Sequence, residues 1–481
     1  MKLFSENGSY KLYQGNMLDM LDVIEPNSID SVITDPPYEL NFMGKGWDNS
    51  GIAFQPDTWK KCYEVLKSGG YLLAFGGSRT FHRIACAIED AGFEIRDTIM
   101  WLYGSGFPKS MNIGLAIDKK NGVESIDTGI KSLNARPNCD KTNTLYESGT
   151  VGKEFTIKKA TNEWNGWGTA LKPSFEPIIV ARKPFKGSLV DNVIEYGVGG
   201  INIDECRVEY EKTTNPATNP LYRQQNSDKY KQVQGGELSN GAVSWTSGKN
   251  GVSEMGRFPA NTILTYDETD FDEVCGGFPN TKGNANPRNN KGTNNEQSNS
   301  VCYGKYNAYV SQNDIWGDSG SASRYFYCAK ASKKDRDEGL DEFEIKSTGE
   351  LQGGRKEGSA GSIMQNANGG TRVNPYAGAG IPKKNTHPTV KPTELMQYLI
   401  RLVTPNNGIV LDPFNGSGST GKAVMYENKE RNKGYKYIGI ELTEEYLPIA
   451  KARIEYVCNL IEKDKLKDKQ LSIFDLGELN E

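Results

Sequence analysis

The chain has 481 residues, more than one domain usually holds, so its length predicts two domains or one domain with a large insertion. Hydrophobic residues make up 36% and 53 residues are glycine, a balance typical of a globular core with much irregular surface. The net charge of -4 does not mark the whole chain as a nucleic-acid binder, although a local basic face can still attract phosphate.

The cysteines and the N-terminal segment exclude several further classes of protein. Eight cysteines are scattered without a CxxC pair, and only two histidines accompany them. This pattern argues against a zinc site and against a disulfide framework, so no metal is expected. The first residues lack an apolar leader, and no run approaches the length of a membrane span. We therefore expect a soluble, cytoplasmic protein with no membrane partner.

The first 110 residues alternate between strand-like and helix-like patterns. Strands are expected at residues 10–16, 29–34, 71–75 and 93–102, with helical spacing after Met17, Trp59 and Phe81. Alternation of this kind predicts an α/β fold with a parallel, doubly wound sheet.

The strand at residues 29–34 runs into the turn Asp35-Pro36-Pro37-Tyr38. Pro37 biases Pro36 away from the α region and each proline removes a backbone donor, so the turn begins no helix and closes no hairpin. Such a rigid loop can grip a planar amine, since Asp35 and the Pro36 carbonyl accept its protons while Tyr38 stacks on its face. The plainer alternative is a strand exit in which Asp35 caps backbone groups and Tyr38 packs on the core.

The middle of the chain is less regular. Periodicity fades from about residue 104 to 170, and one β-like run follows at residues 175–181. Residues 205–375 then shift to Asn, Gly, Ser and Gln, with Lys and Arg among Tyr and Trp. Two interpretations stay open: an insertion without a core, or a loop-rich DNA reader that orders on its target. Strands are expected within it at residues 257–264 and 324–328.

Regular structure resumes at His387-Pro388-Thr389-Val390-Lys391-Pro392. The expected elements are a helix with Leu395, Tyr398, Leu399 and Leu402 on one face, a strand at 409–411, a glycine-rich loop at 412–421 that opens a helix, a strand at 437–441, and a last helix with Leu447, Ala450, Ile454 and Val457 on one face. Strand, loop, helix and strand make a βαβ unit.

The glycine-rich loop indicates a nucleoside-containing cofactor. Glu441 closes the second strand of the unit, where its carboxylate can accept two ribose hydroxyls. Gly416 and Gly418 allow the backbone to approach the ligand. Asp412 and Asn415 can hold the ammonium of an amino acid moiety, and ribose with an amino acid is the combination in S-adenosylmethionine.

The same loop also nearly matches a phosphate-binding loop. Gly416 to Lys422 satisfies GxxxxGK, and Asp412-Pro413 would set a carboxylate beside the phosphates, but Ala423 stands where a Ser or Thr hydroxyl should bind magnesium. Lys422 is expected to be a solvated helix lysine. Three functions therefore remain: an enzyme using S-adenosylmethionine, a nucleotide-dependent DNA-binding protein, or a non-enzymatic DNA reader.

Taken together, these motifs resemble the β class of DNA amino-methyltransferases, in which the DPPY motif comes first and FxGxG last, here Phe414-Asn415-Gly416-Ser417-Gly418. The block at residues 387–392 is similar to the segment that precedes the cofactor loop in that class. The resemblance covers about residues 10–110 and 385–460, while residues 166–173 and 255–345 look like methylases of phages and prophages. It implies methyl transfer to an exocyclic amine of a DNA base, with N6-adenine expected from Asp35 and N4-cytosine as the alternative.

The resemblance also implies further cofactor-binding residues. These are Thr389, Lys391, Pro392, Pro413, Phe414 and Ser417. The family often has Gly-Asp where this chain has Gly15-Asn16, so Asn16 or Asp19 is expected to accept the adenine amino group of the cofactor. His82 and His387 are expected to be structural.

The implied organisation has five parts: a catalytic half (1–110), a connecting, DNA-facing segment (111–204), a loop-rich target-recognition region (205–375), a cofactor-binding half (376–465) and a polar C-terminal tail (466–481). Double-stranded DNA is the expected partner. The sequence leaves open whether the chain forms a homodimer and whether a cognate restriction endonuclease accompanies it.

Overall fold

The computed structural model describes residues 2–40, 46–103, 110–133, 154–208, 256–266, 280–281, 320–321, 326–330, 333–345, 363–365, 371–373 and 384–477. The chain divides into two compact units. The first comprises Met1–Cys206, Asn261–Val274 and Cys328–Glu481, and the second comprises Arg207–Ala260 and Cys275–Tyr327. The site described below belongs entirely to the first unit.

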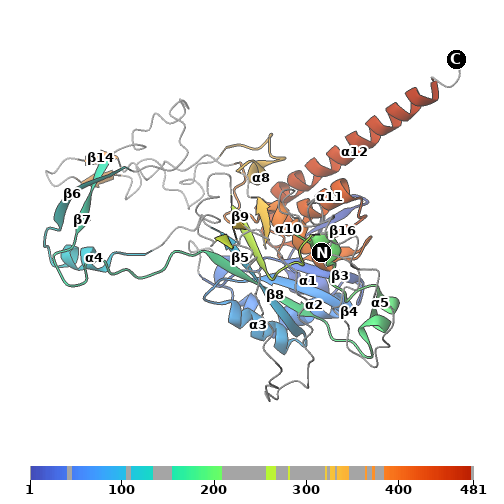
Figure 1. The fold of residues 1–481 in the computed structure, drawn as a ribbon, viewed down its shortest axis with the longest axis horizontal. Coiled ribbons are helices and arrows are strands. Elements are labelled where there is room, and N and C mark those ends of the chain that lie inside the picture. The colour runs from blue at the N-terminus through green and yellow to red at the C-terminus, as the bar shows by residue number, and fades with distance from the viewer. Residues whose placement is uncertain are drawn as a thin grey trace, which may run out of the picture. The chain divides into compact units, whose positions relative to one another are not determined.

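A mixed sheet forms the centre of the first unit (Figure 1). Within the described residues it has ten strands, in the order β1 (Lys2–Glu6), β2 (Tyr10–Gln14), β16 (Lys436–Glu441), β15 (Ile409–Asp412), β3 (Ile29–Thr34), β4 (Leu66–Phe75), β8 (Phe175–Arg182), β5 (Glu94–Tyr103), β9 (Thr262–Tyr266) and β12 (Tyr327–Lys330). The strands from β2 to β4 are parallel, whereas β8 is antiparallel to both β4 and β5. The expected α/β sheet is confirmed, but the expectation of a parallel sheet is wrong at β8 and at β1, which pairs antiparallel with β2.

The two halves of the expected sheet meet side by side. β15 pairs with β3 through Val410↔Ser31 and Leu411↔Val32, and β16 pairs with β2. Strands from the two ends of the chain therefore lie next to each other in one parallel core. Because all of them point the same way, the loops that follow β3, β15 and β16 leave from one edge of the sheet.

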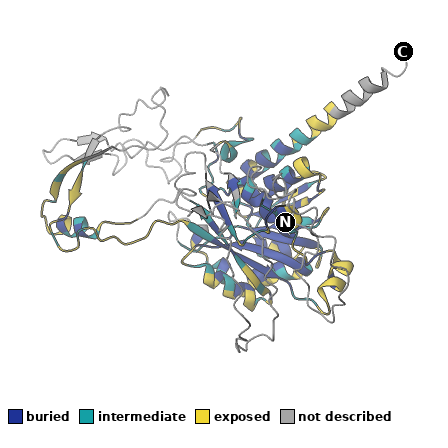
Figure 2. Ribbon diagram, in the orientation of Figure 1, coloured by how far each residue is buried: buried dark blue, intermediate teal, exposed yellow. Residues whose placement is uncertain are grey.

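Helices cover both faces of this core (Figure 1). α1 (Met17–Leu21), α2 (Pro56–Val65) and α3 (Phe81–Asp90) pack on one face, and α10 (Thr393–Val403), α11 (Ser419–Arg431) and α12 (Leu447–Gly477) gather on the other. Trp59, Cys62 and Val65 recur every three residues on α2, so they share one side of the helix, and all three are buried. Figure 2 shows the strands of the central sheet as the most buried layer.

Several elements lie where the sequence pattern was weak. They are α4 (Ile113–Lys120), the hairpin of β6 (Ile126–Leu133) and β7 (Glu154–Lys159), α5 (Leu189–Tyr196) and α8 (Lys333–Asp337). The remaining short elements are β10 (Asn280–Thr281) with β11 (Gly320–Ser321), β13 (Ile363–Gln365) with β14 (Thr371–Val373), and the 3₁₀ turns Gly46–Asn49, Ile52–Phe54, Asp204–Cys206 and Glu444–Tyr446. Among the helices described, none is long and apolar enough to span a membrane.

The expected strand at residues 257–264 is shorter than predicted. Arg257 forms an isolated bridge with Val208 in the second unit, and β9 begins only at Thr262. Much of the region 205–375, with the recognition role expected of it, lies outside the described residues. The C-terminal tail expected from residue 466 continues α12 as far as Gly477.

Candidate active site

A cavity of about 1080 Å³ lies at the edge where the parallel strands end. Of the expected site residues, its lining includes Asn16, Asp35, Pro36, Pro37, Tyr38, Thr389, Lys391, Asp412, Pro413, Phe414, Asn415, Gly416, Ser417 and Glu441. Asp19, Pro392 and Gly418 are not part of the lining, and Asp19 is exposed on α1. The fold thus joins the DPPY turn and the glycine-rich loop in one cavity, as the parallel arrangement predicts.

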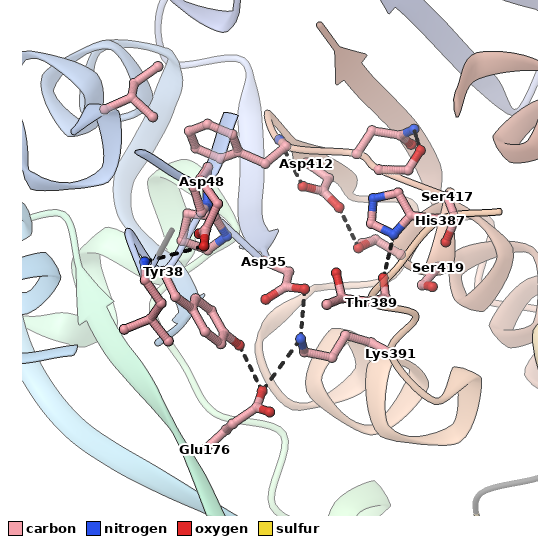
Figure 3. A pocket seen from close by; sticks show the side chains of 18 of the residues that line it. Asp35, Tyr38, Asp48, Glu176, His387, Thr389, Lys391, Asp412, Ser417 and Ser419 are labelled. Atoms are coloured by element: carbon pink, nitrogen blue, oxygen red, sulfur yellow. Dashed lines mark hydrogen bonds and ion pairs between the residues drawn. The ribbon is translucent and has the colours of Figure 1, made fainter. Parts of the chain in front are cut away.

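Asp35 lies at the centre of this cavity (Figure 3). All six residues of β3 are buried, which fixes the strand end from which Asp35 projects. Its Oδ2 accepts a hydrogen bond from Lys391 Nζ at 2.7 Å. Its Oδ1 is buried without a hydrogen-bond partner among the described residues. A buried carboxylate oxygen in this state favours a ligand that can donate a hydrogen bond.

Tyr38 is held from both of its ends. Its hydroxyl donates to Glu176 Oε2 at 2.7 Å, and its backbone carbonyl accepts from Thr80 Oγ1 at 2.8 Å. Burial, aided by the charges of Asp35 and Glu176, raises the pKa of Tyr38 well above its ordinary value, so the ring stays a neutral phenol. Asp48 stabilises the two residues that follow Tyr38, because its carboxylate accepts hydrogen bonds from the backbone N–H groups of Glu39 and Leu40.

Lys391 connects the block at residues 387–392 to Asp35 and Glu176, which also line the cavity. Nζ lies 2.7 Å from Asp35 Oδ2 and 3.4 Å from Glu176 Oε2. Burial alone would lower the pKa of Lys391, but the charges of Asp35 and Glu176 outweigh burial and raise it. Lys391 was expected among the cofactor ligands, and its ammonium group is directed at Asp35 (Figure 3).

The glycine-rich loop begins with a buried carboxylate. Asp412 accepts hydrogen bonds from Thr34 Oγ1 and Thr420 Oγ1, each at 2.6 Å, and from the Phe414 N–H at 3.1 Å. Burial raises the pKa of Asp412 to about 6 in spite of these donors. An incoming cation such as an ammonium group would therefore stabilise its charged form.

Gly416 brings the loop close to two side chains. Its φ is +53°, and a Cβ there would lie 2.9 Å from His387 Nε2. Its N–H donates to Glu441 Oε2 at 2.7 Å, and the other oxygen of Glu441 accepts from the Thr443 N–H at 2.7 Å. Burial raises the pKa of Glu441 to about 7 against these hydrogen bonds.

Two of the predicted polar ligands instead shape the backbone. Asn415 accepts from the Tyr437 hydroxyl at 2.8 Å through Oδ1 and donates to the Gly416 carbonyl at 3.0 Å through Nδ2. Asn16 caps α1 by accepting from the Leu18 N–H at 3.1 Å, while it lines the cavity. Each side-chain oxygen still has a second lone pair for a ligand.

Lys422 contradicts the expectation of a solvated helix lysine. Its side chain is fully buried and lies 2.6 Å from Asp335 Oδ1 and 2.8 Å from Glu338 Oε2. Both carboxylates come from α8 or the residue after it, far away in the sequence. A lysine occupied in this way is not available to a phosphate group, which counts against the phosphate-loop alternative.

Three further residues, which were not apparent from the sequence, support the glycine-rich loop, the start of α10 and the block at residues 387–392. Arg453 on α12 is buried and donates through Nη1 to the Ser417 carbonyl at 2.8 Å and to Ser419 Oγ at 3.2 Å. Asp335 accepts from the Thr393 N–H at 2.8 Å at the start of α10. Arg336 donates to the His387 carbonyl at 2.5 Å. Because their partners lie on distant segments, spacing along the chain gave no signal for them.

His387 lines the cavity, and its contacts support the structural role expected of it. Its ring packs edge-on against Tyr446 with centroids 4.5 Å apart, and Nδ1 lies 2.5 Å from the Thr389 carbonyl. Burial lowers the pKa of His387 to about 3, so the ring is neutral near pH 7. A neutral ring at this distance donates from Nδ1 to the carbonyl and stiffens the block before Lys391.

The fold and the cavity define an α/β protein in which a glycine-rich loop and the acidic turn Asp35–Tyr38 line one cavity at the ends of the parallel strands. A family model described as DNA methylase matches residues 29–452, so the chain belongs to the DNA methylase family.

Individual relatives match shorter parts of the chain. The Type II methyltransferase M.HindIII of Haemophilus influenzae is 26% identical over 233 residues, which are 40% of this chain and 64% of that protein. The putative methylase YubD of Escherichia coli is 42% identical over 82 residues, 17% of this chain and 34% of that protein. The chain therefore spans less than two thirds of either relative.

The chain also matches solved structures at low identity. The structure titled PvuII DNA methyltransferase (cytosine-N4-specific) covers 96% of both chains at 12% identity with a TM-score of 0.37. The M1.HpyAVI-SAM complex covers 92% of this chain and 99% of the other at 14% identity with a TM-score of 0.32.

Proposed function

We propose that this protein transfers a methyl group from S-adenosylmethionine to the N6 amine of adenine in double-stranded DNA. The observation that carries the proposal is Asp35 Oδ1, a buried acceptor without a partner among the described residues. It lies in the cavity that also contains Tyr38 and the glycine-rich loop. Membership of the DNA methylase family supports the same reaction class.

The residues around the glycine-rich loop fit the cofactor. Glu441 would accept its ribose hydroxyls, and Asp412 would hold its ammonium group with Asn415 nearby. The backbone at Gly416 would pass along it, where a Cβ would crowd the loop. When bound, the cofactor supplies an electrophilic methyl group on a sulfonium sulfur, which keeps the electron pair of the bond that breaks.

The acidic turn would hold and orient the base. The target must leave the double helix, because its amine is paired inside the duplex. Tyr38, fixed by Glu176, stacks on the flipped base, while Asp35 Oδ1 and the Pro36 carbonyl accept the two amine hydrogens. This aims the nitrogen lone pair at the methyl carbon, and Asp35 then takes the proton that the methylated nitrogen loses. Rate enhancement comes from positioning and electrostatics.

Adenine is favoured over cytosine by the first residue of the turn. A carboxylate binds an amine by a charge-assisted hydrogen bond, which is stronger than a bond to a serine hydroxyl. In the family that the sequence resembles, aspartate at this position usually accompanies adenine and serine usually accompanies N4-cytosine. The sequence leaves the homodimer and the endonuclease partner open, and the cytoplasmic location remains a prediction from it.

The role of Asp35 is tested with purified wild type and Asp35→Ala on unmethylated DNA. The variant should lose methyl transfer by about 10²–10³-fold, the scale of losing one preorganised electrostatic contact. Its affinity for S-adenosylhomocysteine should stay within a few-fold, since Asp35 faces the base. Transfer by the variant near the wild-type rate would show that this turn does not bind the target amine.

A further inference from the structure

We infer that Lys391 and Glu176 are positioning residues for the methyl transfer. They set the orientation of the Asp35 carboxylate and the net charge of the cluster that the three residues form. This inference rests on the proposed function and adds two residues to it. Lys391 was expected among the cofactor ligands, and Glu176 was not expected in the site.

Geometry gives each of the two residues a distinct contact. Lys391 Nζ binds Oδ2 of Asp35, which leaves Oδ1 buried without a hydrogen-bond partner among the described residues and therefore available to a substrate amine. Glu176 Oε2 accepts from the Tyr38 hydroxyl and lies 3.4 Å from Lys391 Nζ. Its Oε1 accepts from the Tyr103 hydroxyl at 3.2 Å. The carboxylate that grips the amine and the ring that stacks on the base are thus tied to one lysine.

The walls around the lysine make this arrangement rigid. The Lys391 side chain is 8% exposed. Nζ lies 5.0 Å from the Phe75 ring centroid, 5.3 Å from that of Tyr38 and 5.8 Å from that of Trp101. Aromatic faces attract a cation and exclude water, so the ammonium is held between the two carboxylates.

The charge balance suits a reaction that makes the amine cationic. Asp35 and Glu176 each carry a negative charge and Lys391 a positive one, so the three together carry a single negative charge. When the amine nitrogen forms its bond to the methyl carbon it gains positive charge, which a net negative cluster stabilises. Lysine and Asp35 alone would be neutral and would give less stabilisation. Glu176 therefore offsets the lysine that orients Asp35.

The test compares the pH dependence of kcat for Lys391→Met, Lys391→Arg and Glu176→Gln. The titratable groups around Asp35, Lys391 and Glu176 include Tyr38, Tyr103, His387 and Asp412, and none of these is changed. Lys391→Met leaves two carboxylates without their cation, so one keeps a proton to higher pH and the acid limb of kcat should move upward. Glu176→Gln removes a negative neighbour, so the acid limb should move downward, with a modest fall in kcat.

The expected changes in kcat follow from the electrostatic role of Lys391. Lys391→Met should lower kcat by roughly 10²-fold, on the scale of one preorganised charged contact, with the KM for DNA and the affinity for S-adenosylhomocysteine within a few-fold. Lys391→Arg keeps the charge and should recover much of the loss. Lys433→Met is the matched control, because Lys433 is also 8% exposed and ion-paired, to Glu205 at 2.5 Å, away from the cavity.

The outcomes separate this inference from the proposed function. Absence of methyl transfer by the wild type would refute the proposed function itself. An active wild type with Lys391→Met as active as Lys433→Met would overturn only the role of Lys391. If Lys391→Met does not fold, Glu176→Gln decides, since an acid limb that stays in place or moves upward contradicts the charge balance.

Discussion

At the scale of single residues, the cavity contains carboxylates in two contrasting environments. Asp35 is paired with Lys391, whereas Glu441 is buried beside backbone donors with no salt-bridge partner among the described residues. The pKa of Glu441 rises to about 7 because burial disfavours its charge. In the free protein Glu441 therefore holds a proton at a pH where an ordinary glutamate has lost it.

This raised pKa predicts a pH-dependent cofactor affinity. Ribose hydroxyls donate to the ionised carboxylate, so binding should release the proton and weaken as pH falls below about 7. The affinity for S-adenosylhomocysteine should drop by up to about tenfold per pH unit below 7 and level off above it. Calorimetry between pH 5.5 and 8.5 measures this slope. Glu441→Gln removes this titration and is the control, and an unchanged slope in that variant would assign the effect to another group such as Asp412.

The sequence identified some site residues and missed others for a physical reason. Asp35, Tyr38, Gly416 and Glu441 follow strand ends in recognisable motifs, so local pattern was enough. Glu176 lies on β8, which enters the sheet antiparallel between β4 and β5. No spacing in the chain reveals which strand becomes the neighbour of another.

At the scale of elements, the loop between β15 and α11 depends on a conformation that few residues adopt. Gly416 has a φ of +53°, and Gly418, at the start of α11, has a φ of +73°. A Cβ at Gly418 would lie 2.9 Å from the Ala450 backbone, so this glycine serves the packing of α11 on α12. Gly418 thus has a structural role, whereas Gly416 lines the cavity.

Gly416→Ala should impair the cofactor site more than the fold. The left-handed backbone costs a non-glycine residue about 1–2 kcal/mol, and the new methyl group would meet His387. We expect a modestly lower melting temperature and an affinity for S-adenosylhomocysteine at least about tenfold weaker, at this energy scale. Gly200→Ala is the control, because nothing lies within 4 Å of a Cβ there. Unchanged affinity in Gly416→Ala would remove the loop from the cofactor site.

The stability of the protein is also expected to depend on the contact between α8 and α11. Lys422 is fully buried between Asp335 and Glu338, so Lys422→Met removes the nearest cation from both half-buried carboxylates and leaves only Arg453, 3.9 Å from Asp335. Breaking a buried pair in this way should destabilise the protein by about 3–5 kcal/mol in chemical denaturation. Lys451→Met, whose side chain is 42% exposed, should have little effect. Equal stability of the two variants would contradict the structural role of Lys422. Stabilisation of the wild type by ATP would instead support the phosphate-loop alternative.

Most regular elements could be predicted at this scale, and the exceptions share a cause. Residues 29–34 form β3 as expected, because a short apolar run between turn signals is unambiguous. α8 has only five residues, all of them charged, so it has no apolar face, and it is fixed by Lys422 and Thr393 on distant segments. Tertiary contacts of this kind leave no local pattern.

At the scale of the whole molecule, the region between the two halves of the sheet contains more than an insertion. β9 belongs to the central sheet, and α8 contributes Asp335, which binds Thr393 at the start of α10, and Arg336, which binds the His387 carbonyl beside the cavity. Deletion of residues 205–375 would therefore damage the methylase half as well. A test of target recognition must leave these elements in place.

A narrower deletion is possible because Val208 and Arg257 lie next to each other. Each backbone N–H donates to the carbonyl of the other, at 3.0 Å and 2.7 Å, so a short turn can replace residues 210–255. The expected result is retained affinity for S-adenosylhomocysteine with loss of preference for a DNA site. Mapping of modified bases by single-molecule sequencing in a host without adenine methylation measures this preference. Methylation of the same site by the shortened protein would place recognition elsewhere.

The chemical identity of the product tests the proposed methyl transfer to the N6 amine of adenine most directly. Purified protein is incubated with S-adenosylmethionine carrying a deuterated methyl group and with genomic DNA from a host without DNA methylation, and the DNA is digested to nucleosides for mass spectrometry. We expect the labelled methyl group on N6-methyladenine, at a level that Asp35→Ala strongly reduces. Label on N4-methylcytosine without N6-methyladenine, or no labelled nucleoside from protein that binds S-adenosylhomocysteine, would contradict the proposal.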